Sequence, residues 1–140
     1  MKVREAMAKT ISTATRDDTV ATVAGLMKKE DCGFIPIVDD GRPIGVVTDR
    51  DIVLRCLAIG HDDCLHDKAG EVMTSPVWSI SADADIEEAA HEMAVHEVRR
   101  LPATEDGRLI GILSFGNLEQ ALRGEGAAAK EATLGVTHGA

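Results

Sequence analysis

The sequence predicts an α/β (α+β) fold of two tandem β-α-β-β-α repeats, packed sheet to sheet with pseudo-twofold symmetry. The first observation is a duplication: the stretch Gly33–Val53 is repeated in Leu101–Leu118, with Pro36 matching Pro102 at an offset of 66 positions, which indicates tandem units. The second is a hairpin signal in each copy, and the third is helical apolar spacing before each hairpin. Because the helices can cover only one face of so small a sheet, the other face is expected to need a partner sheet.

Length and composition restrict the function classes. The chain has 140 residues, of which 2% are aromatic, and a formal net charge of −9. One domain or two tightly joined small ones, with an aliphatic core, is therefore expected, and the charge argues against a nucleic-acid partner. No apolar run reaches the ~20 residues of a membrane span, and no apolar signal core is found at the N-terminus. We expect no membrane association and a cytoplasmic location.

The cysteine content is also informative. Cys32, Cys56 and Cys64 are an odd number, so no complete disulfide framework is implied and reduced thiols are expected. Cys32 and Cys56 are interpreted as small apolar filling residues.

In the first repeat, apolar residues spaced i, i+3, i+4 and i+7 predict a helix with one buried face, and β-branched runs flanking an Asp-Gly turn predict the hairpin. Asp17 or Asp18 is expected to cap the first long helix, and Gly60 to end the second. The expected elements are a turn or helix at Val3–Met7, a strand at Thr10–Thr13, a helix at Thr19–Asp31 with Val20, Val23, Ala24 and Met27 inward, strands at Phe34–Val38 and Ile44–Val47, and a helix from Arg50 to Ile59.

The second repeat is expected to follow the same order. Its elements are a turn or helix at Ala69–Met73, a strand at Pro76–Ser79, a helix at Asp85–Glu97 with Ile86, Ala89, Ala90 and Met93 inward, a hairpin within Leu101–Leu118, and a last helix from Phe115 to Leu122 that stops near Gly124. The domains are therefore predicted as residues 1–60, a polar linker at 61–68, residues 69–124, and a flexible Ala/Gly-rich tail at 125–140.

The hairpin of each copy leads directly into a helix start. Thr48 and Asp51 are three apart on the first helical turn and are therefore neighbours on one face. A helix start offers unpaired backbone N–H groups and a positive dipole end, which suit a phosphate. Both residues are also favoured as simple helix caps, and the sequence alone leaves both interpretations open.

The repeated pattern, Pro36 followed by Asp40-Gly41 and then Gly45-x-x-Thr48-x-x-Asp51, resembles the CBS domain, named for cystathionine β-synthase. The resemblance covers Val3 to Leu122 and is to a stand-alone CBS pair of the bacterial stress-protein kind. It implies a regulatory, signal-transducing protein rather than an enzyme. It also implies an adenosine-containing ligand (AMP or ATP first, with ADP, NAD or S-adenosylmethionine as other options), a homodimer packed through its helices, and a protein target.

The resemblance further implies which residues bind the nucleotide in the cleft between the repeats. The motif carboxylate accepts hydrogen bonds from both ribose hydroxyls, Trp78 would stack on adenine, and arginines would bind phosphate. The expected site comprises Thr48, Arg50, Asp51, Trp78, Val98, Arg99, Arg100 and Pro102. A second, weaker site, in which an amide stands in place of the motif carboxylate, comprises Ser12, Cys32, Gly33, Phe34, Pro36, Ser114 and Asn117.

The same residues also allow other interpretations. Trp78 could be an ordinary core residue, and Arg99 and Arg100 a solvated corner. His61, Cys64 and His66 in the linker have the side chains that zinc prefers, although their spacing matches no standard site. The alternative function is therefore a dimeric stress-response scaffold without nucleotide, in one version stabilised by metal at the linker. No nucleophile, base and orienting group stand together in the sequence, so no catalytic residues are predicted.

Overall fold

The computed structural model describes residues 1–60 and 62–124, so the predicted tail at 125–140 lies outside the described residues. The chain divides into two compact units. The central unit is Ser12–Val77, and the terminal unit combines Met1–Ile11 with the described residues from Trp78 onward. The units therefore do not follow the repeat boundaries, because the opening segment of each repeat packs with the hairpin of the other.

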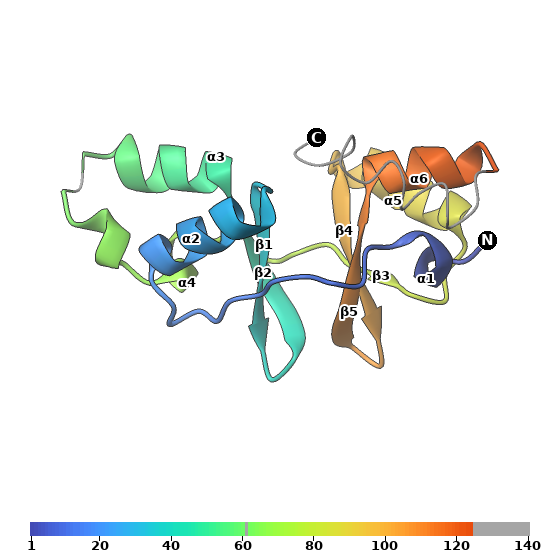
Figure 1. Ribbon diagram of the computed structural model, residues 1–140, viewed down its shortest axis with the longest axis horizontal. Helices are drawn as coiled ribbons and strands as arrows, with labels where there is room; N and C mark the ends of the chain where they lie inside the picture. Colours follow the sequence, from blue (N-terminus) through green and yellow to red (C-terminus); the bar gives the residue numbers. More distant parts are fainter. Residues whose placement is uncertain (61, 125–140) are drawn as a thin grey trace. The chain divides into compact units, whose positions relative to one another are not determined.

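The central unit contains an antiparallel hairpin flanked by helices. The predicted strands and the helix before them are confirmed, and the helix after them continues from α3 into a turn of π-helix, η1 (Figure 1). Its elements are α2 (Val20–Glu30), β1 (Phe34–Asp39), β2 (Arg42–Thr48), α3 (Asp49–Ile52), η1 (Val53–Leu57), the 3₁₀ turn η2 (Cys64–His66) and α4 (Ala69–Val72).

The terminal unit repeats this plan and adds a short parallel strand. In the sheet of this unit, β3 pairs parallel to β4, which pairs antiparallel to β5. Its elements are α1 (Val3–Ala6), β3 (Ile80–Ser81), α5 (Ile86–His96), β4 (Arg100–Glu105), β5 (Arg108–Ser114) and α6 (Phe115–Leu122). The segment before α5 is held to α1 by backbone hydrogen bonds, from Val3 N–H to the Ala84 carbonyl at 2.9 Å and from Arg4 N–H to the Ala82 carbonyl at 2.8 Å.

Two predicted strands are misplaced. The strand expected at Pro76–Ser79 lies at Ile80–Ser81, and the strand expected at Thr10–Thr13 is a single parallel bridge from Ala14 to Ile37. Ala14 and Ile80 are buried, and pairing follows the residues that reach the core rather than the more polar stretches before them.

The predicted cap of α2 is also wrong. Thr19 caps the helix, because its hydroxyl oxygen accepts a hydrogen bond from the Thr22 N–H at 3.1 Å. Asp18 instead accepts one from the Thr15 N–H at 2.8 Å and closes the turn that precedes the helix. Hydroxyl and carboxylate residues compete for this position with similar preference, so the sequence did not decide between them.

Each unit has its own aliphatic core. In the central unit the inward residues of α2 pack on the hairpin, and in the terminal unit those of α5 and α6 do so. Each fully buried aliphatic side chain contributes roughly 1.5–3 kcal/mol relative to exposure. The large buried residues include Val20, Val23, Ile35, Ile37 and Val47 in the central unit and Leu101, Leu113 and Leu118 in the terminal unit.

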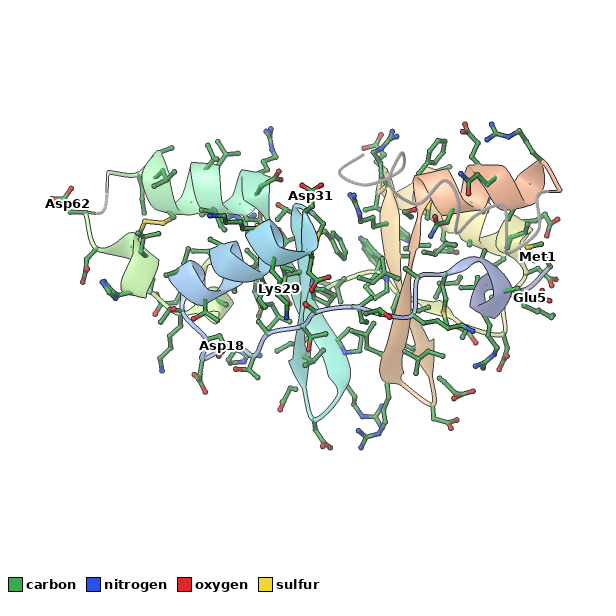
Figure 2. The ribbon with its side chains drawn as sticks, viewed as in Figure 1. Met1, Glu5, Asp18, Lys29, Asp31 and Asp62 are labelled. Carbon is green, nitrogen blue, oxygen red and sulfur yellow. A yellow bond between two sulfur atoms is a disulfide. The ribbon has the colours of Figure 1, made fainter. Side chains whose placement is uncertain are left out.

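A disulfide overturns the expectation of reduced thiols. Cys56 on η1 and Cys64 on η2 are bonded to each other, and both are buried (Figure 2). Cys32 is a free, half-buried thiol. The odd cysteine count is consistent with one bridge and one free thiol, so counting alone could not exclude the bridge.

Ion pairs tie the start of the chain to the terminal unit. The Lys2 ammonium lies 3.0 Å from the Asp85 carboxylate, and this hydrogen bond holds the pKa of Asp85 below its usual value.

None of the described helices is long and apolar enough to cross a bilayer.

Candidate functional site

The hairpin of the central unit places Thr48 at the start of α3, where Thr48 and Asp51 cap the helix reciprocally. The Thr48 hydroxyl accepts a hydrogen bond from the Asp51 N–H at 3.1 Å, and the Asp51 carboxylate accepts one from the Thr48 N–H at 2.9 Å. This capping box satisfies two backbone donors that the helix itself cannot pair. Capping is thus confirmed as one role of this pair. The Asp51 residue is only 7% exposed.

Two residues that sequence reasoning missed, Arg55 and Thr74, complete a polar cluster. The Thr74 hydroxyl donates to Asp51 Oδ1 at 3.0 Å, and Arg55 Nη1 lies 3.6 Å from the same oxygen. Arg55 Nη1 also donates to the carbonyls of Val72 and Met73, each at 3.0 Å. We call Thr48, Asp51, Arg55 and Thr74 the Asp51 cluster.

Thr74 reaches Asp51 because the segment after α4 pairs with β2. Thr74 N–H donates to the Val46 carbonyl at 2.8 Å, and Val46 N–H donates to the Thr74 carbonyl at 3.0 Å. Gly45 permits this approach, since a Cβ atom there would lie 2.7 Å from Met73 Sδ. The spacing of Asp51 and Arg55, four residues apart on one helix, was a signal available in the sequence, whereas the position of Thr74 was not.

The predicted site residues are distributed over the two units. Thr48, Arg50 and Asp51 belong to the central unit, and the structure brings Thr48 and Asp51 into contact. Arg50 is exposed on α3, and its backbone N–H donates to the Asp49 carboxylate at 2.9 Å. The remaining predicted residues, Trp78, Val98, Arg99, Arg100 and Pro102, all lie in the terminal unit.

Within the terminal unit, Trp78 is not a core residue. It is 48% exposed, and its ring stacks on His96 with the centroids 3.8 Å apart and the planes 9° from parallel. His96 Nε2 lies 3.0 Å from a carboxylate oxygen of Glu92. An aromatic ring with one face covered can offer its other face to a planar group.

The other predicted residues of this unit differ in exposure. The Arg99 guanidinium is exposed and lies 4.8 Å from the centroid of the Phe115 ring, a cation–π distance. Val98 and Arg100 are half-buried, and Pro102 is buried. Arg99 is therefore the more accessible of the two adjacent arginines.

The corner equivalent to the Asp51 cluster has Ser114 and the uncharged amide of Asn117 in place of Thr48 and Asp51. Ser114 caps α6 by accepting a hydrogen bond from the Asn117 N–H at 3.1 Å, and Asn117 is buried. In the central unit, the Ser12 hydroxyl donates to a Glu30 carboxylate oxygen at 2.8 Å. The other members of the predicted weaker site, Cys32, Gly33, Phe34 and Pro36, also belong to the central unit.

The disulfide bears directly on the weak metal candidates of the linker. Cys64 is bonded to Cys56 and so cannot act as a thiolate ligand, and His66 is exposed, 3.6 Å from Asp63. His61 lies outside the described residues. Across residues 1–60 and 62–124, His, Cys, Asp and Glu side chains do not gather in a group of three or more able to hold a metal ion.

Comparison with known proteins agrees with the duplicated plan. The sequence model of the CBS domain matches residues 3–57 and 69–124. The CBS domain-containing protein YhcV of Bacillus subtilis is 36% identical over 116 residues, which cover 83% of this chain and 81% of that protein.

Solved structures support the same assignment. The crystal structure of Hypoxic Response Protein I with two coordinated zinc ions is 33% identical, with a TM-score of 0.78, and the match covers 86% of this chain and 98% of that one. The crystal structure of CBSX2 in complex with AMP is 26% identical, with a TM-score of 0.73, and the match covers 88% of this chain and 96% of that one.

Proposed function

Because the chain belongs to the CBS domain family, we propose that it is a regulatory module that binds an adenine nucleotide at the Asp51 cluster. The observation that carries the proposal is the Asp51 carboxylate, buried to 7% exposure and oriented by hydrogen bonds from both Thr48 and Thr74. A carboxylate is an acceptor with two oxygens, and it therefore complements the two hydroxyl donors of a ribose. The AMP complex of the related CBSX2 supports the choice of ligand.

The regulatory step follows from differential binding. A nucleotide that binds one conformation of the protein more tightly shifts the population toward that conformation, and a protein partner can read the change. The proposed role is therefore sensing rather than catalysis. AMP is the first candidate ligand and ATP the second; the contributions of Trp78, Arg99 and Arg100 stay predictions, tested by Trp78→Ala and Arg99→Gln.

We expect Asp51→Ala to weaken AMP binding by at least tenfold, because each hydrogen bond to a charged group is worth roughly 1.5–3 kcal/mol. Calorimetric titration of ligand-free protein with AMP, ADP, ATP, NAD and S-adenosylmethionine measures this. Asp17→Ala, which removes an exposed carboxylate of the same unit paired with Lys68 at 3.3 Å, should leave the affinity unchanged. If the ligand-free wild-type protein binds none of these compounds, the proposal fails.

We also propose that the protein is a homodimer that packs through the helices. Val53, Leu54 and Leu57, on η1, are 51%, 46% and 61% exposed. Three neighbouring exposed aliphatic side chains favour association. Leu57→Glu is expected to convert a dimer into a monomer at micromolar concentration, as light scattering would measure. Arg42→Glu places the same charge at an exposed hairpin position and should leave the dimer intact; a monomeric wild-type protein would contradict the proposal.

The alternative function, a metal-stabilised scaffold, is suggested by the zinc ions of Hypoxic Response Protein I. The bond between Cys56 and Cys64 disfavours it here, because it removes the only thiolate of the linker set. Elemental analysis of protein purified without a histidine tag decides between the two. Stoichiometric zinc without nucleotide binding would favour the scaffold.

A further inference from the structure

We propose that Arg55 and Thr74 are positioning residues that orient the Asp51 carboxylate toward the vicinal diol of the ligand. This inference rests on the proposed function and deepens it. It assigns a role to two residues that lie outside the Thr48–Asp51 motif and that contact Asp51 from different segments of the central unit.

The Asp51 carboxylate keeps acceptor positions that its contacts with the protein do not use. An ionised carboxylate has about four lone-pair positions on its two oxygens. Within the part of the chain that the structure describes, Oδ2 accepts a hydrogen bond from the Thr48 N–H at 2.9 Å and Oδ1 accepts one from the Thr74 hydroxyl at 3.0 Å. About two positions remain, one on each oxygen, and this number matches the two hydroxyl donors of a ribose diol.

The Asp51 carboxylate is held through both of its oxygens. The Thr48 N–H fixes one oxygen, but that bond alone allows the carboxylate to rotate. The Thr74 hydroxyl fixes the other oxygen, and Arg55 Nη1 is 3.3 Å from that hydroxyl and 3.6 Å from Asp51 Oδ1. Arg55 is itself anchored by the carbonyls of Val72 and Met73. The plane of the carboxylate is thus set before a ligand arrives, which lowers the ordering cost of binding.

The terminal unit distinguishes a positioning role of Arg55 and Thr74 from a purely structural one. The terminal unit has the same backbone frame, in which Ala8 forms with Ile112 the bridge that Thr74 forms with Val46. Ala8 lies 66 positions before Thr74, and Ala121 lies 66 positions after Arg55. The bridge therefore forms without a hydroxyl or an arginine. These two side chains occur where the motif residue is a carboxylate and are absent where it is the amide of Asn117.

The test compares AMP with the same nucleotide lacking both ribose hydroxyls, 2′,3′-dideoxy-AMP, by calorimetry. We expect wild-type protein to prefer AMP by at least tenfold, because the diol donates to a charged acceptor. Arg55→Gln and Thr74→Val should each weaken AMP binding about tenfold and leave the affinity for the dideoxy compound unchanged. Thr74→Ser keeps the hydroxyl and should restore the preference.

Two controls make the outcome decisive. Arg42→Gln removes an exposed arginine of the same unit and should change neither affinity. In an Asp51→Ala background, Arg55→Gln should have no further effect on AMP, because the residue acts through Asp51. Thermal melting of each variant establishes that it is folded at the titration temperature.

Each remaining outcome overturns a defined statement. If Arg55→Gln weakens both nucleotides equally, Arg55 contacts another part of the ligand or supports the fold, and the positioning role is wrong. If it changes neither affinity, the role is also wrong. If wild-type protein binds neither nucleotide, the proposed function fails and this inference fails with it.

Discussion

Gly45→Ala is expected to lower the free energy of unfolding by about 2 kcal/mol, within the roughly 1–3 kcal/mol that overpacking costs. A Cβ atom at this position would lie 2.7 Å from Met73 Sδ and 2.9 Å from the Thr74 carbonyl oxygen. The sulfur can move, but the carbonyl belongs to the backbone bridge with Val46. The segment that carries Thr74 must therefore shift away from β2. Urea denaturation measures the loss of stability.

The same substitution is expected to weaken AMP binding, because displaced Thr74 can no longer hold the Asp51 carboxylate. Gly111→Ala is the matched control: its Cβ would meet Met7 Sδ at 2.6 Å and the Ala8 carbonyl oxygen at 2.8 Å in the terminal unit. It should cost similar stability while the Asp51 cluster stays intact. Comparable losses of AMP affinity in both variants would show that general destabilisation, not the position of Thr74, controls binding.

Gly25→Ala is expected to raise the free energy of unfolding, in contrast to Gly45→Ala. Gly25 lies within α2, and apart from its chain neighbours and the backbone of the helix itself, no described atom lies within 4 Å of a Cβ built there. Alanine is favoured over glycine in a helix interior by about 1 kcal/mol, so this variant should be more stable than the wild-type protein. Gly25 is therefore expected to tolerate alanine, whereas Gly45, which the segment carrying Thr74 approaches closely, is not.

Much of this fold could be predicted because its signals are local. The Asp-Gly turns and β-branched runs indicated both hairpins, and the apolar spacing indicated α2 and α5 within one or two residues of their observed ends. The structure confirms these elements because propensity, pattern and burial agree there. The duplication then supplied the second copy of each element from the first.

The assignment of segments to compact units was harder to obtain. The order of residues along the chain assigns Ala69–Val72 and Thr74 to the second repeat, whereas in the structure they pack with the hairpin of the first repeat. This contact joins residues far apart in the sequence, and no local propensity encodes it. Thr74 was missed for that reason. Arg55 was missed although the sequence offered a signal, an acid and a base four residues apart on one helix.

The expectation of reduced thiols failed for a different reason. An odd cysteine count excludes a fully paired framework but not a single bridge. Whether Cys56 can reach Cys64 depends on the packing of η1 and η2, and in the structure their Cα atoms lie 5.4 Å apart. No periodic pattern in the sequence predicts that packing.

Removal of this bridge is the second large effect we expect. A cross-link between residues separated by eight positions restricts the unfolded chain, and loop-closure entropy gives a stabilisation of about 2.5 kcal/mol. Cys56→Ala, Cys64→Ala and addition of dithiothreitol should each lower the free energy of unfolding by a comparable amount in urea denaturation. A thiol titration of denatured, unreduced protein should find one reactive group, Cys32, and three after reduction.

The double variant distinguishes a bridge from two independent buried residues. If the sulfurs are bonded, Cys56→Ala combined with Cys64→Ala should cost little more than either change alone, since the first has already removed the cross-link. Cys32→Ala, at the free and half-buried thiol, should change the free energy of unfolding by the same amount with and without the Cys56 and Cys64 substitutions. It should also leave the effect of dithiothreitol unchanged. Additive losses, together with three reactive thiols in unreduced protein, would instead mean that the two sulfurs only pack together. The position of η1, and with it Arg55, would then depend on packing and on the Arg55 hydrogen bonds alone.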